Sequence, residues 1–548
     1  MTKKKVLFCT EASWLSTGYA VYTKEVLNRL VKEEDIEVAE LACYANMEDV
    51  ERHPTPWQVY PNKPLPDDPN YKHYQSSASA QFGEQVFNHV LLHFQPDIVI
   101  DIRDWWMMEY QQRSPFRDFF HWSIMPTVDA EPQADQWINT YATADSVFAY
   151  SEFGAKTLQN QCKDIPLYGV ASPAASSVFK PHPDKDAHKE SLGLSKDAWI
   201  VGTVMRNQKR KLYPDLFKSF RMFLDEVADA NAFLYCHTYY PDIGWDIPKL
   251  LNEYGLSSRV LFTYKCSHCG KISVNFFQDS VQHCRHCNNF TSQLVGINNS
   301  IEEAELAAIY NLFDVYVQYA NSEGFGMPQL EAAQCGVPLV TIDYSAMQSV
   351  ADNIGALSVK PLTYSIECET GCKRAIPDNH QFTQELINLY DTKEQLPSFG
   401  ELIRDKAMEH YSWDKTAQMW LSLIRRIPVK DRSETWLSPP KIFEPETEIP
   451  SNIEHMVDKV NFIFNKVLHK PEWIGSFLWK KVLKDCTFGY RCENLDKDFY
   501  FSESHVQSQH GNQSFSIDDA MREMAHFRRQ MNEWEKERHS KLLAPGRV

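Results

Sequence analysis

The sequence predicts an α/β fold with two doubly wound parallel sheets, and three observations support this prediction. Short apolar runs of strand length alternate with amphipathic helical segments over residues 5–427. Several of these runs lead through a glycine-containing or polar turn directly into a helix, which offers free backbone N–H groups to an anion. The chain has 548 residues, of which 43% are hydrophobic and 24% charged. This composition is that of a globular protein, and the length is too great for one core.

The first unit is expected over residues 1–183. Lys5–Thr10 has the pattern of a strand, a loop containing Gly18 follows, and Val21–Glu33 is an amphipathic helix. Further strands are expected at Ile36–Ala45 and Pro96–Ile102, whereas residues 51–75, rich in proline, asparagine and aspartate, should form an excursion. Gly18 would let a ligand approach the backbone. A single glycine is not the three-glycine dinucleotide fingerprint, which argues against a nicotinamide or flavin dehydrogenase.

The second unit is expected over residues 184–427, and it carries a basic turn between its first strand and its first helix. The turn follows WIVGTVM and contains Arg206, Lys209, Arg210 and Lys211. Cations at a βα turn add charge-assisted bonds to the helix N–H groups, so the pattern indicates a diphosphate site. The other interpretation is a solvated basic surface loop.

A second turn, NSEGFGMPQLEAAQCGVP (residues 321–338), follows the strand-like run DVYVQYA. It places Glu323 in the turn and Glu331 about two helical turns on. Carboxylates accept hydrogen bonds from hydroxyls in pairs, so this spacing indicates recognition of sugar and ribose beside a phosphate. Taken alone, the stretch fits an ordinary βα turn with two surface glutamates equally well.

Three polar residues of the first unit, Asp104, His121 and Asp129, lie at or beyond expected strand ends. Open α/β sheets bind their ligands at the carboxyl ends of strands. By composition alone, a structural or solvated role is favoured for each of them.

Together, VGTVMRNQKRK, WDIPKLLNEYGLSSRV, the segment from AAIYNLFDVYVQYA to CGVPLV, and HYSWDKTAQMW resemble retaining glycosyltransferases of the GT-B fold. This superfamily includes sucrose-synthase-type and bacterial glycan-building enzymes. The resemblance covers roughly residues 5–427, and Glu323 and Glu331 match its Glu-x7-Glu motif. It implies two Rossmann-like domains facing across a cleft. It also implies transfer of a sugar from a nucleoside diphosphate sugar, with retention of configuration and without a catalytic metal.

The resemblance also implies roles for individual residues. Arg206 and Lys211 would neutralise the donor diphosphate, with Lys209 or Arg210 as fallback choices, and Gly18 would sit beneath it. Glu331 would hold the ribose and Glu323 the donor sugar, which the amides of Gly324, Phe325, Gly326 and Met327 would cradle. Asp129 is the best match for an acceptor-side catalytic residue, and His121 is the second.

Between two elements of the second unit, residues 264–292 contain Cys266, Cys269, Cys284 and Cys287 in the spacing C-x2-C-x14-C-x2-C. This spacing predicts an inserted zinc ribbon, in which four thiolates complete the coordination of a structural Zn²⁺. No coordination position is left open for catalysis, and His268, His283 and His286 are expected to be solvated. Four unrelated thiols are the alternative.

Residues 428–548 are expected to form a linker and a mostly helical extension. The proline- and acid-rich SPPKIFEPETEIPS precedes tryptophan-bearing helical segments, and a charged helix begins near Ser516. That last helix could mediate self-association, lie on the body of the protein or be solvated.

Net charge, apolar runs and cysteine count narrow the expected cellular location and binding partners of the protein. The net charge of −17 disfavours a generally basic nucleic-acid binder, no apolar run approaches the roughly 18 residues of a membrane span, and the start is not a signal peptide. Thirteen cysteines without an export signal predict the cytoplasm, or the host cytoplasm for a viral protein. A UDP-sugar is the favoured donor.

For the acceptor, the ribbon and the aromatic-basic segment Arg103–Trp106 favour a hydroxymethylated pyrimidine in DNA, since phage DNA-modifying glycosyltransferases share the GT-B fold. The alternatives are a glycan, protein or small-molecule acceptor, or a non-catalytic binding protein of the same fold.

Overall fold

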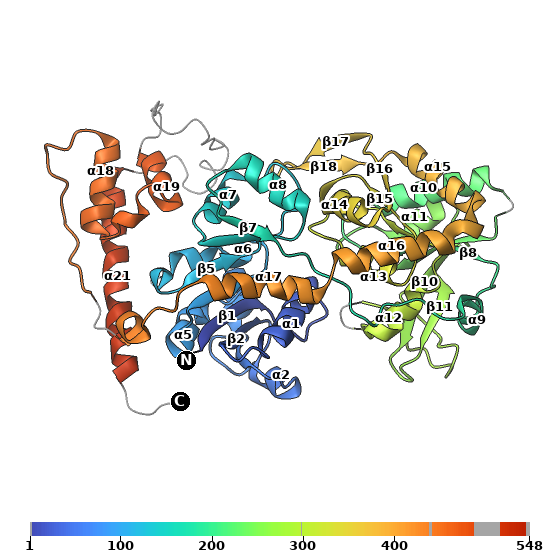
Figure 1. The fold of residues 1–548 in the computed structure, drawn as a ribbon, viewed down its shortest axis with the longest axis horizontal. Helices are drawn as coiled ribbons and strands as arrows, with labels where there is room; N and C mark the ends of the chain where they lie inside the picture. The colour runs from blue at the N-terminus through green and yellow to red at the C-terminus, as the bar shows by residue number, and fades with distance from the viewer. Residues whose placement is uncertain are drawn as a thin grey trace.

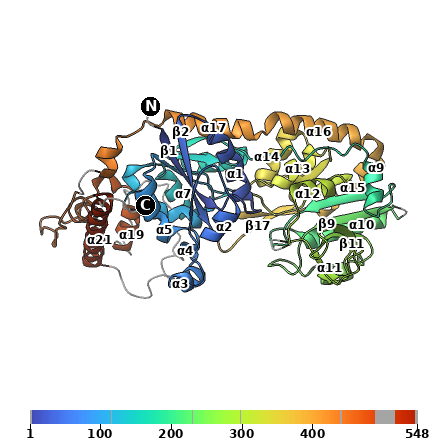
Figure 2. The same ribbon diagram turned by 90° about the horizontal axis from the view of Figure 1, so that it is seen from below.

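The computed structural model describes residues 3–114, 116–228, 230–296, 299–437, 441–486 and 516–543. Figure 1 shows three parts in a row: a helical extension, a first α/β domain and a second α/β domain. The view from below in Figure 2 shows the same order. Both domains are organised around a mainly parallel sheet, which confirms the predicted α/β class.

The first sheet has the order β3-β2-β1-β4-β5-β6-β7, and all its neighbouring strands pair in parallel. Its strands are β1 (Lys4–Glu11), β2 (Ile36–Cys43), β3 (Gln58–Pro61), β4 (Ile98–Asp101), β5 (His121–Ile124), β6 (Ser146–Ala149) and β7 (Leu167–Val170). Its helices are α1 (Gly18–Leu30), α2 (Met47–Arg52), α3 (Tyr71–Ser76), α4 (Ala78–Gln81), α5 (Glu84–Phe94), α6 (Trp105–Met108), α7 (Asp135–Ala142) and α8 (Glu152–Gln161).

The expected excursion at residues 51–75 was wrong in one respect, because it contains β3, which pairs with β2. The strand is short and ends in Pro61, which has no N–H to donate. Only the edge of a sheet tolerates such a strand, and β3 is the edge strand.

The second sheet has the order β12-β13-β10-β9-β8-β14-β15-β16, with β11 paired to β10. Its parallel strands are β8 (Trp199–Val204), β9 (Ala232–His237), β10 (Val260–Cys266), β14 (Val315–Gln318), β15 (Leu339–Ile342) and β16 (Leu357–Val359). The antiparallel strands β11 (Ile272–Phe276), β12 (Val281–Gln282) and β13 (Ser292–Leu294) belong to the insertion. A separate hairpin consists of β17 (Thr363–Ile366) and β18 (Lys373–Ile376).

The helices of this half of the chain are α9 (Lys185–Ser191), α10 (Tyr213–Glu226), α11 (Ile247–Glu253), α12 (Glu303–Tyr310), α13 (Met327–Gln334), α14 (Ser345–Ile354), α15 (Asn379–Asp391), α16 (Leu396–His410) and α17 (Trp413–Arg426). In each sheet, the strand order reverses at one place, between β1 and β4 and between β8 and β14. Ligands of open α/β sheets bind outside the carboxyl ends of the strands at such a switch point.

Helix α17 falls within the range expected for the second domain, yet it packs against the first sheet, as Figure 1 shows. Trp420 is fully buried there, its ring centroid 4.2 Å from that of Phe148 and 6.4 Å from that of Phe8. Its indole N–H donates to the Tyr22 hydroxyl at 2.9 Å. The chain therefore crosses between the domains twice.

Replacing Trp420 with alanine should destabilise the protein by about 3–5 kcal/mol, because it leaves a large cavity in the core and removes the hydrogen bond that the Tyr22 hydroxyl accepts. Denaturant unfolding measures this loss, and Gln418→Ala, which shortens an exposed side chain on the same helix, is the matched control. Equal stability of the two variants would contradict the packing described here.

The extension comprises α18 (Met456–Phe462), the π-helical turn η5 (Ile463–Val467), α19 (Phe477–Cys486) and α21 (Ile517–Leu543), which share an apolar core of their own. It is anchored to the first domain by Trp436, which packs on Phe116 and Phe119, and by an ion pair between Lys470 and Asp118. None of the helices that the structure describes has the length and apolar character needed to cross a membrane.

Candidate functional site

The two switch points meet where the turn after β14 lies against the first domain. A Cβ atom built on Gly324 would come within 2.4 Å of the Thr127 side chain, so only glycine permits this approach. Thr127 follows β5, and its hydroxyl lies 2.8 Å from the hydroxyl of Tyr19 in the first turn of α1. The turn after β14 is thus brought to the loops that follow β1 and β5.

Glu323 is the centre of a buried charged cluster. Arg210 donates to its Oε2 atom at 2.6 Å, Gln318 donates to its Oε1 atom at 2.7 Å, and Lys211 forms an ion pair with it. Its backbone N–H donates to Ser345 at 2.9 Å. Burial lowers the pKa of both cations, and the charge of Arg210 lowers that of Lys211 further. Arg210 and Lys211 lie side by side at this turn, and basic side chains of this kind form charge-assisted bonds with an anionic ligand.

The other two basic residues of the predicted turn are placed differently. Arg206 is paired with Asp242, its Nε and Nη2 atoms 2.8 and 3.1 Å from the carboxylate oxygens. Lys209 is exposed. The structure therefore brings Lys211 and the fallback residue Arg210 to Glu323, whereas Arg206 contacts another acid.

Helix α13 begins immediately after the turn, at Met327. Gly326 caps the helix with a φ of +84°, a left-handed conformation that favours glycine. Phe325 is buried against Tyr411, with ring centroids 5.6 Å apart. This packing fixes the turn and leaves the first N–H groups of an eight-residue helix at the switch point.

Glu331 lies on α13 and accepts a hydrogen bond of 2.7 Å from the Tyr310 hydroxyl. Burial raises the pKa of Glu331 to about 7, although the bond from Tyr310 opposes the rise. The carboxylate is consequently poised to change its charge near neutral pH.

From the first domain, Gly18 and Asp129 lie at the same junction. Gly18 is the first residue of α1, and a Cβ atom built on it would meet nothing within 4 Å. Asp129 contacts the second domain, accepting from Arg374 at 2.8 Å and from Ser322 at 3.2 Å. His121 begins β5 and lies 3.0 Å from the Ser146 hydroxyl, so it is at the opposite, amino-terminal edge of the sheet.

Asp104, which follows β4, also belongs to this junction. Its carboxylate hydrogen-bonds Tyr19 and Thr127 and lies near Asp129, and burial raises its pKa to about 6. The strand-end position points to this residue in the sequence. Ser322 lies in the turn of residues 321–338 without a predicted role of its own, and no sequence signal points to Arg374, which belongs to no motif.

The neighbouring Arg103 corrects one expectation. Its side chain is fully buried and bonded to Asp101 and to the Phe82 carbonyl. It therefore cannot hold a DNA strand, and the expected Arg103–Trp106 patch was wrong in this respect. The arginine compensates a buried carboxylate, which the local sequence does not reveal.

The four cysteines of the insertion form a compact cluster, with all Sγ atoms within 4.8 Å of one another. The Sγ atoms of Cys266 and Cys287 are 3.7 Å apart, as are those of Cys269 and Cys284. A tetrahedral Zn²⁺ with Zn–S bonds of about 2.3 Å would separate the sulfurs by roughly 3.8 Å, so the residues fit this ion. His283 and His286 bond to backbone carbonyls instead.

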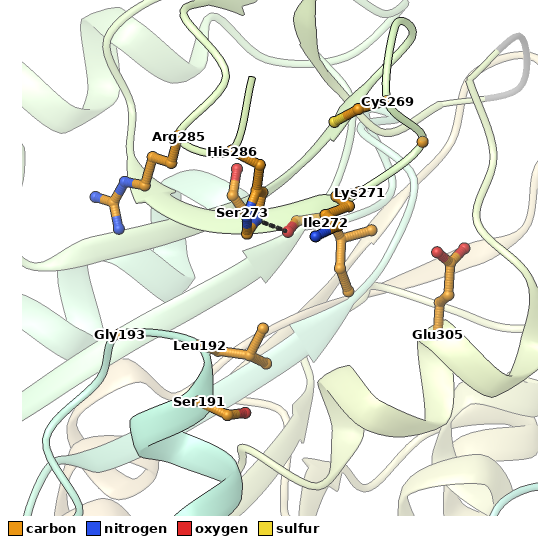
Figure 3. A pocket seen from close by; sticks show the side chains of 11 residues that line it. Ser191, Leu192, Gly193, Cys269, Lys271, Ile272, Ser273, Arg285, His286 and Glu305 are labelled. Carbon is orange, nitrogen blue, oxygen red and sulfur yellow. Dashed lines mark hydrogen bonds between the residues drawn. The ribbon is translucent and has the colours of Figure 1, made fainter. Parts of the chain in front are cut away.

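A cavity of about 630 Å³ lies between the insertion and the end of α9 (Figure 3), and Glu323 is not among the residues that line it. Lys271, Arg285 and His286 line it from the insertion, and Leu192 from the α9 side. Among the described residues, Lys271 and Arg285 have no acidic partner, whereas Glu305 binds the Glu302 N–H and pairs with Lys265. We call this cavity the ribbon groove.

Comparison with known proteins agrees with this geometry. Residues 293–361 match the family "Glycosyl transferases group 1". No curated protein sequence matches the chain.

Solved structures share the fold. The sucrose-phosphate synthase of Thermosynechococcus elongatus is 17% identical, with a TM-score of 0.57 over 77% of this chain and 98% of that one. The Anabaena protein HepE in complex with UDP and glucose is 12% identical, with a TM-score of 0.54 over 77% and 99%. A glycosyltransferase from Rickettsia africae is 11% identical, with a TM-score of 0.53 over 78% and 99%. At these identities the likeness concerns the fold, which is the predicted GT-B fold.

Proposed function

We propose that this protein is a glycosyltransferase that moves a sugar from a nucleoside diphosphate sugar, preferentially a UDP-sugar, to an acceptor hydroxyl with retention of configuration. The observation that carries the proposal is the meeting of the Arg210–Lys211–Glu323 cluster with Asp129 across the two switch points. The match of residues 293–361 to group 1 glycosyl transferases supports the same enzyme class. Retention follows from the resemblance to retaining enzymes.

The proposed chemistry needs positive charge at the leaving diphosphate. Lys211 and Arg210, with Arg206 and Lys209 nearby in the same turn, and the N–H groups at the start of α13 would stabilise the charge that builds on the phosphates. Gly18 leaves room for the phosphates beside α1. Glu323 would orient the sugar, with the amides of Gly324–Met327 around it, Glu331 would accept from the ribose hydroxyls, and Asp129 would face the acceptor. Among the described residues, no acidic cluster is arranged to hold a catalytic metal here.

The donor half is tested by incubating the purified full-length chain with UDP-, GDP-, ADP- and TDP-sugars. Binding by calorimetry and release of the nucleoside diphosphate are measured, and UDP-sugars are expected to give both. Absence of binding and of release with every donor would refute the proposed function.

The pKa of Glu331 gives this binding a pH dependence. Ribose hydroxyls donate to the ionised carboxylate, so donor binding should favour loss of the proton that Glu331 holds below about pH 7. UDP affinity should therefore rise by up to about tenfold per pH unit towards pH 7 and then level off.

The matched variant Glu331→Gln has no carboxylate that can titrate at this position. Its UDP affinity over the same pH range gives the pH dependence of UDP itself, which is subtracted from that of the wild type. Tyr310→Phe removes the bond that favours the ionised carboxylate and should move the midpoint to higher pH. Identical pH profiles for the wild type and Glu331→Gln would contradict the assigned role.

For the acceptor we propose a hydroxymethylated pyrimidine in DNA. The ribbon groove supports it, since Lys271 and Arg285 are exposed and lack acidic partners among the described residues, and such cations bind phosphates. The test is binding to hydroxymethylated duplex DNA at low and moderate salt, followed by mass spectrometry of DNA incubated with mixed donors. Arg285→Glu should weaken DNA binding and reduce its salt dependence. The matched control is Lys249→Glu on α11, which makes the same change of charge outside the ribbon groove.

Absence of binding at low salt would refute the DNA acceptor and leave the donor chemistry intact. Glycan, protein and small-molecule acceptors are then the remaining classes.

We further propose that Cys266, Cys269, Cys284 and Cys287 hold a structural Zn²⁺, supported by the close approach of their four sulfurs. Action in the cytoplasm is supported by the free thiols of the described cysteines.

Self-association through α21 stays a prediction, and part of that helix is occupied by the core of the extension.

A further inference from the structure

The hairpin β17–β18 is placed at the junction of the two domains, as Figures 1 and 2 both show. It begins at Thr363, and the family match of residues 293–361 ends just before it. Its first strand is exposed along its whole length. The hairpin thus lies at the rim of the site, just after the segment that matches the family.

Hydrogen bonds to backbone carbonyls fix the hairpin to both sides of the junction. The Lys373 N–H donates to the Glu131 carbonyl at 2.8 Å, and the Cys372 thiol donates to the Pro132 carbonyl at 2.9 Å, both in the first domain. The Ala375 N–H donates at 3.0 Å to the carbonyl of Asn321, which begins the turn after β14. The residue between these anchors is Arg374.

Arg374 joins three segments. Its Nη1 atom donates to Asp129 at 2.8 Å and to the Ser322 hydroxyl at 2.5 Å, and its Nη2 atom donates to Glu367 of the hairpin at 2.7 Å. Only 13% of its side chain is exposed. A planar guanidinium can bond several acceptors in fixed directions, which an ammonium cannot do as rigidly.

We propose that Arg374 is a positioning residue that orients the Asp129 carboxylate towards the acceptor and couples that orientation to closure of the two domains. The inference rests on the proposed function, in which Asp129 faces the acceptor. Ser322 adjoins Glu323, so one side chain links the acceptor-side acid to the donor turn. The hairpin is bonded to both domains on either side of Arg374, so a separation of the domains would break one set of these bonds and disturb the contact between Arg374 and Asp129.

Kinetics of the full-length chain test the proposal. Arg374→Ala should lower kcat for transfer by roughly 100-fold, the effect of a small misplacement of a reacting group, and leave UDP affinity within about twofold. Arg374→Lys should recover part of the rate because it keeps the charge without the fork. The matched control is Lys373→Ala, which removes a half-exposed ion pair of 3.4 Å to Glu131 from the same strand. Equal kcat values for Arg374→Ala and Lys373→Ala would overturn the proposal. So would a fall in the UDP affinity of Arg374→Ala as large as its fall in kcat.

A double-mutant cycle shows whether Arg374 acts through Asp129. In an Asp129→Asn background, Arg374→Ala should cost little further activity, and full additivity would overturn the proposal. The same four proteins are compared by thermal unfolding, where the Tm shifts should also be non-additive. This second readout needs no activity. If the wild type is inactive but the Tm shifts of the four proteins are non-additive, the proposed function alone is refuted. If the wild type is active but both the activities and the Tm shifts are additive, the role of Arg374 alone is refuted.

Discussion

Replacing Lys211 with alanine is expected to reduce the rate of sugar transfer by roughly 100- to 1,000-fold, the usual cost of removing one preorganised donor to a developing negative charge. Lys211 is buried and paired with Glu323, so its side chain is held at the turn that precedes α13 before any ligand arrives. The loss should appear in kcat, because charge on the phosphates is greatest in the transition state. Steady-state release of UDP from a UDP-sugar with acceptor present measures it.

The control is Lys209→Ala, which removes an exposed cation two residues earlier and should change the rate less than tenfold. The fold should survive Lys211→Ala, since Arg210 and Gln318 still pair with Glu323. If Lys211→Ala and Glu323→Ala both kept the wild-type rate, a non-catalytic binding protein of the same fold would be the correct reading.

Removal of the metal from the insertion is the second large effect. Structural Zn²⁺ contributes about 10–16 kcal/mol of apparent binding free energy in small zinc domains, and that energy is folding energy. Cys284→Ser should therefore abolish bound zinc, and hydrogen exchange should rise across residues 266–294. Elemental analysis gives the zinc content, with one ion per chain expected in the wild type.

The matched control for this experiment is Cys368→Ser, which alters an exposed thiol outside the cluster. It should leave both the zinc content and the exchange unchanged. A wild-type protein that is purified without zinc and gains no exchange protection when zinc is added would contradict the proposed structural ion.

Much of the fold could be predicted because apolar periodicity is a local property. The buried strands β1, β4, β8 and β14 each carry an uninterrupted apolar run, and their turns hold the residues expected for a site. Strand β3 could not be predicted in this way, since four residues ending in proline give too short a pattern. Its pairing with β2 is set by tertiary contact.

The candidate site shows the same difference between local patterns, which can be predicted from the sequence, and tertiary contacts, which cannot. The pairing of Lys211 with Glu323 joins two motifs, and each motif could be recognised by itself. The pairing of Arg206 with Asp242 and the burial of Arg103 against Asp101 depend on where loops fold. Arg374 is the clearest case, because it reaches Asp129 over 245 positions of sequence from a hairpin without a motif.

The return of the chain to the first sheet at α17 has a consequence for synthesis on the ribosome. Trp420 covers Phe8 and Phe148 in one apolar cluster of the first domain, and Trp436 covers Phe116 in another, so both clusters stay incomplete until the second domain has been made. At 5–20 residues per second, the nascent chain carries that apolar surface uncovered for on the order of ten seconds or more. A fragment ending at residue 183 should aggregate, and a soluble first domain should require residues 413–437 joined to it.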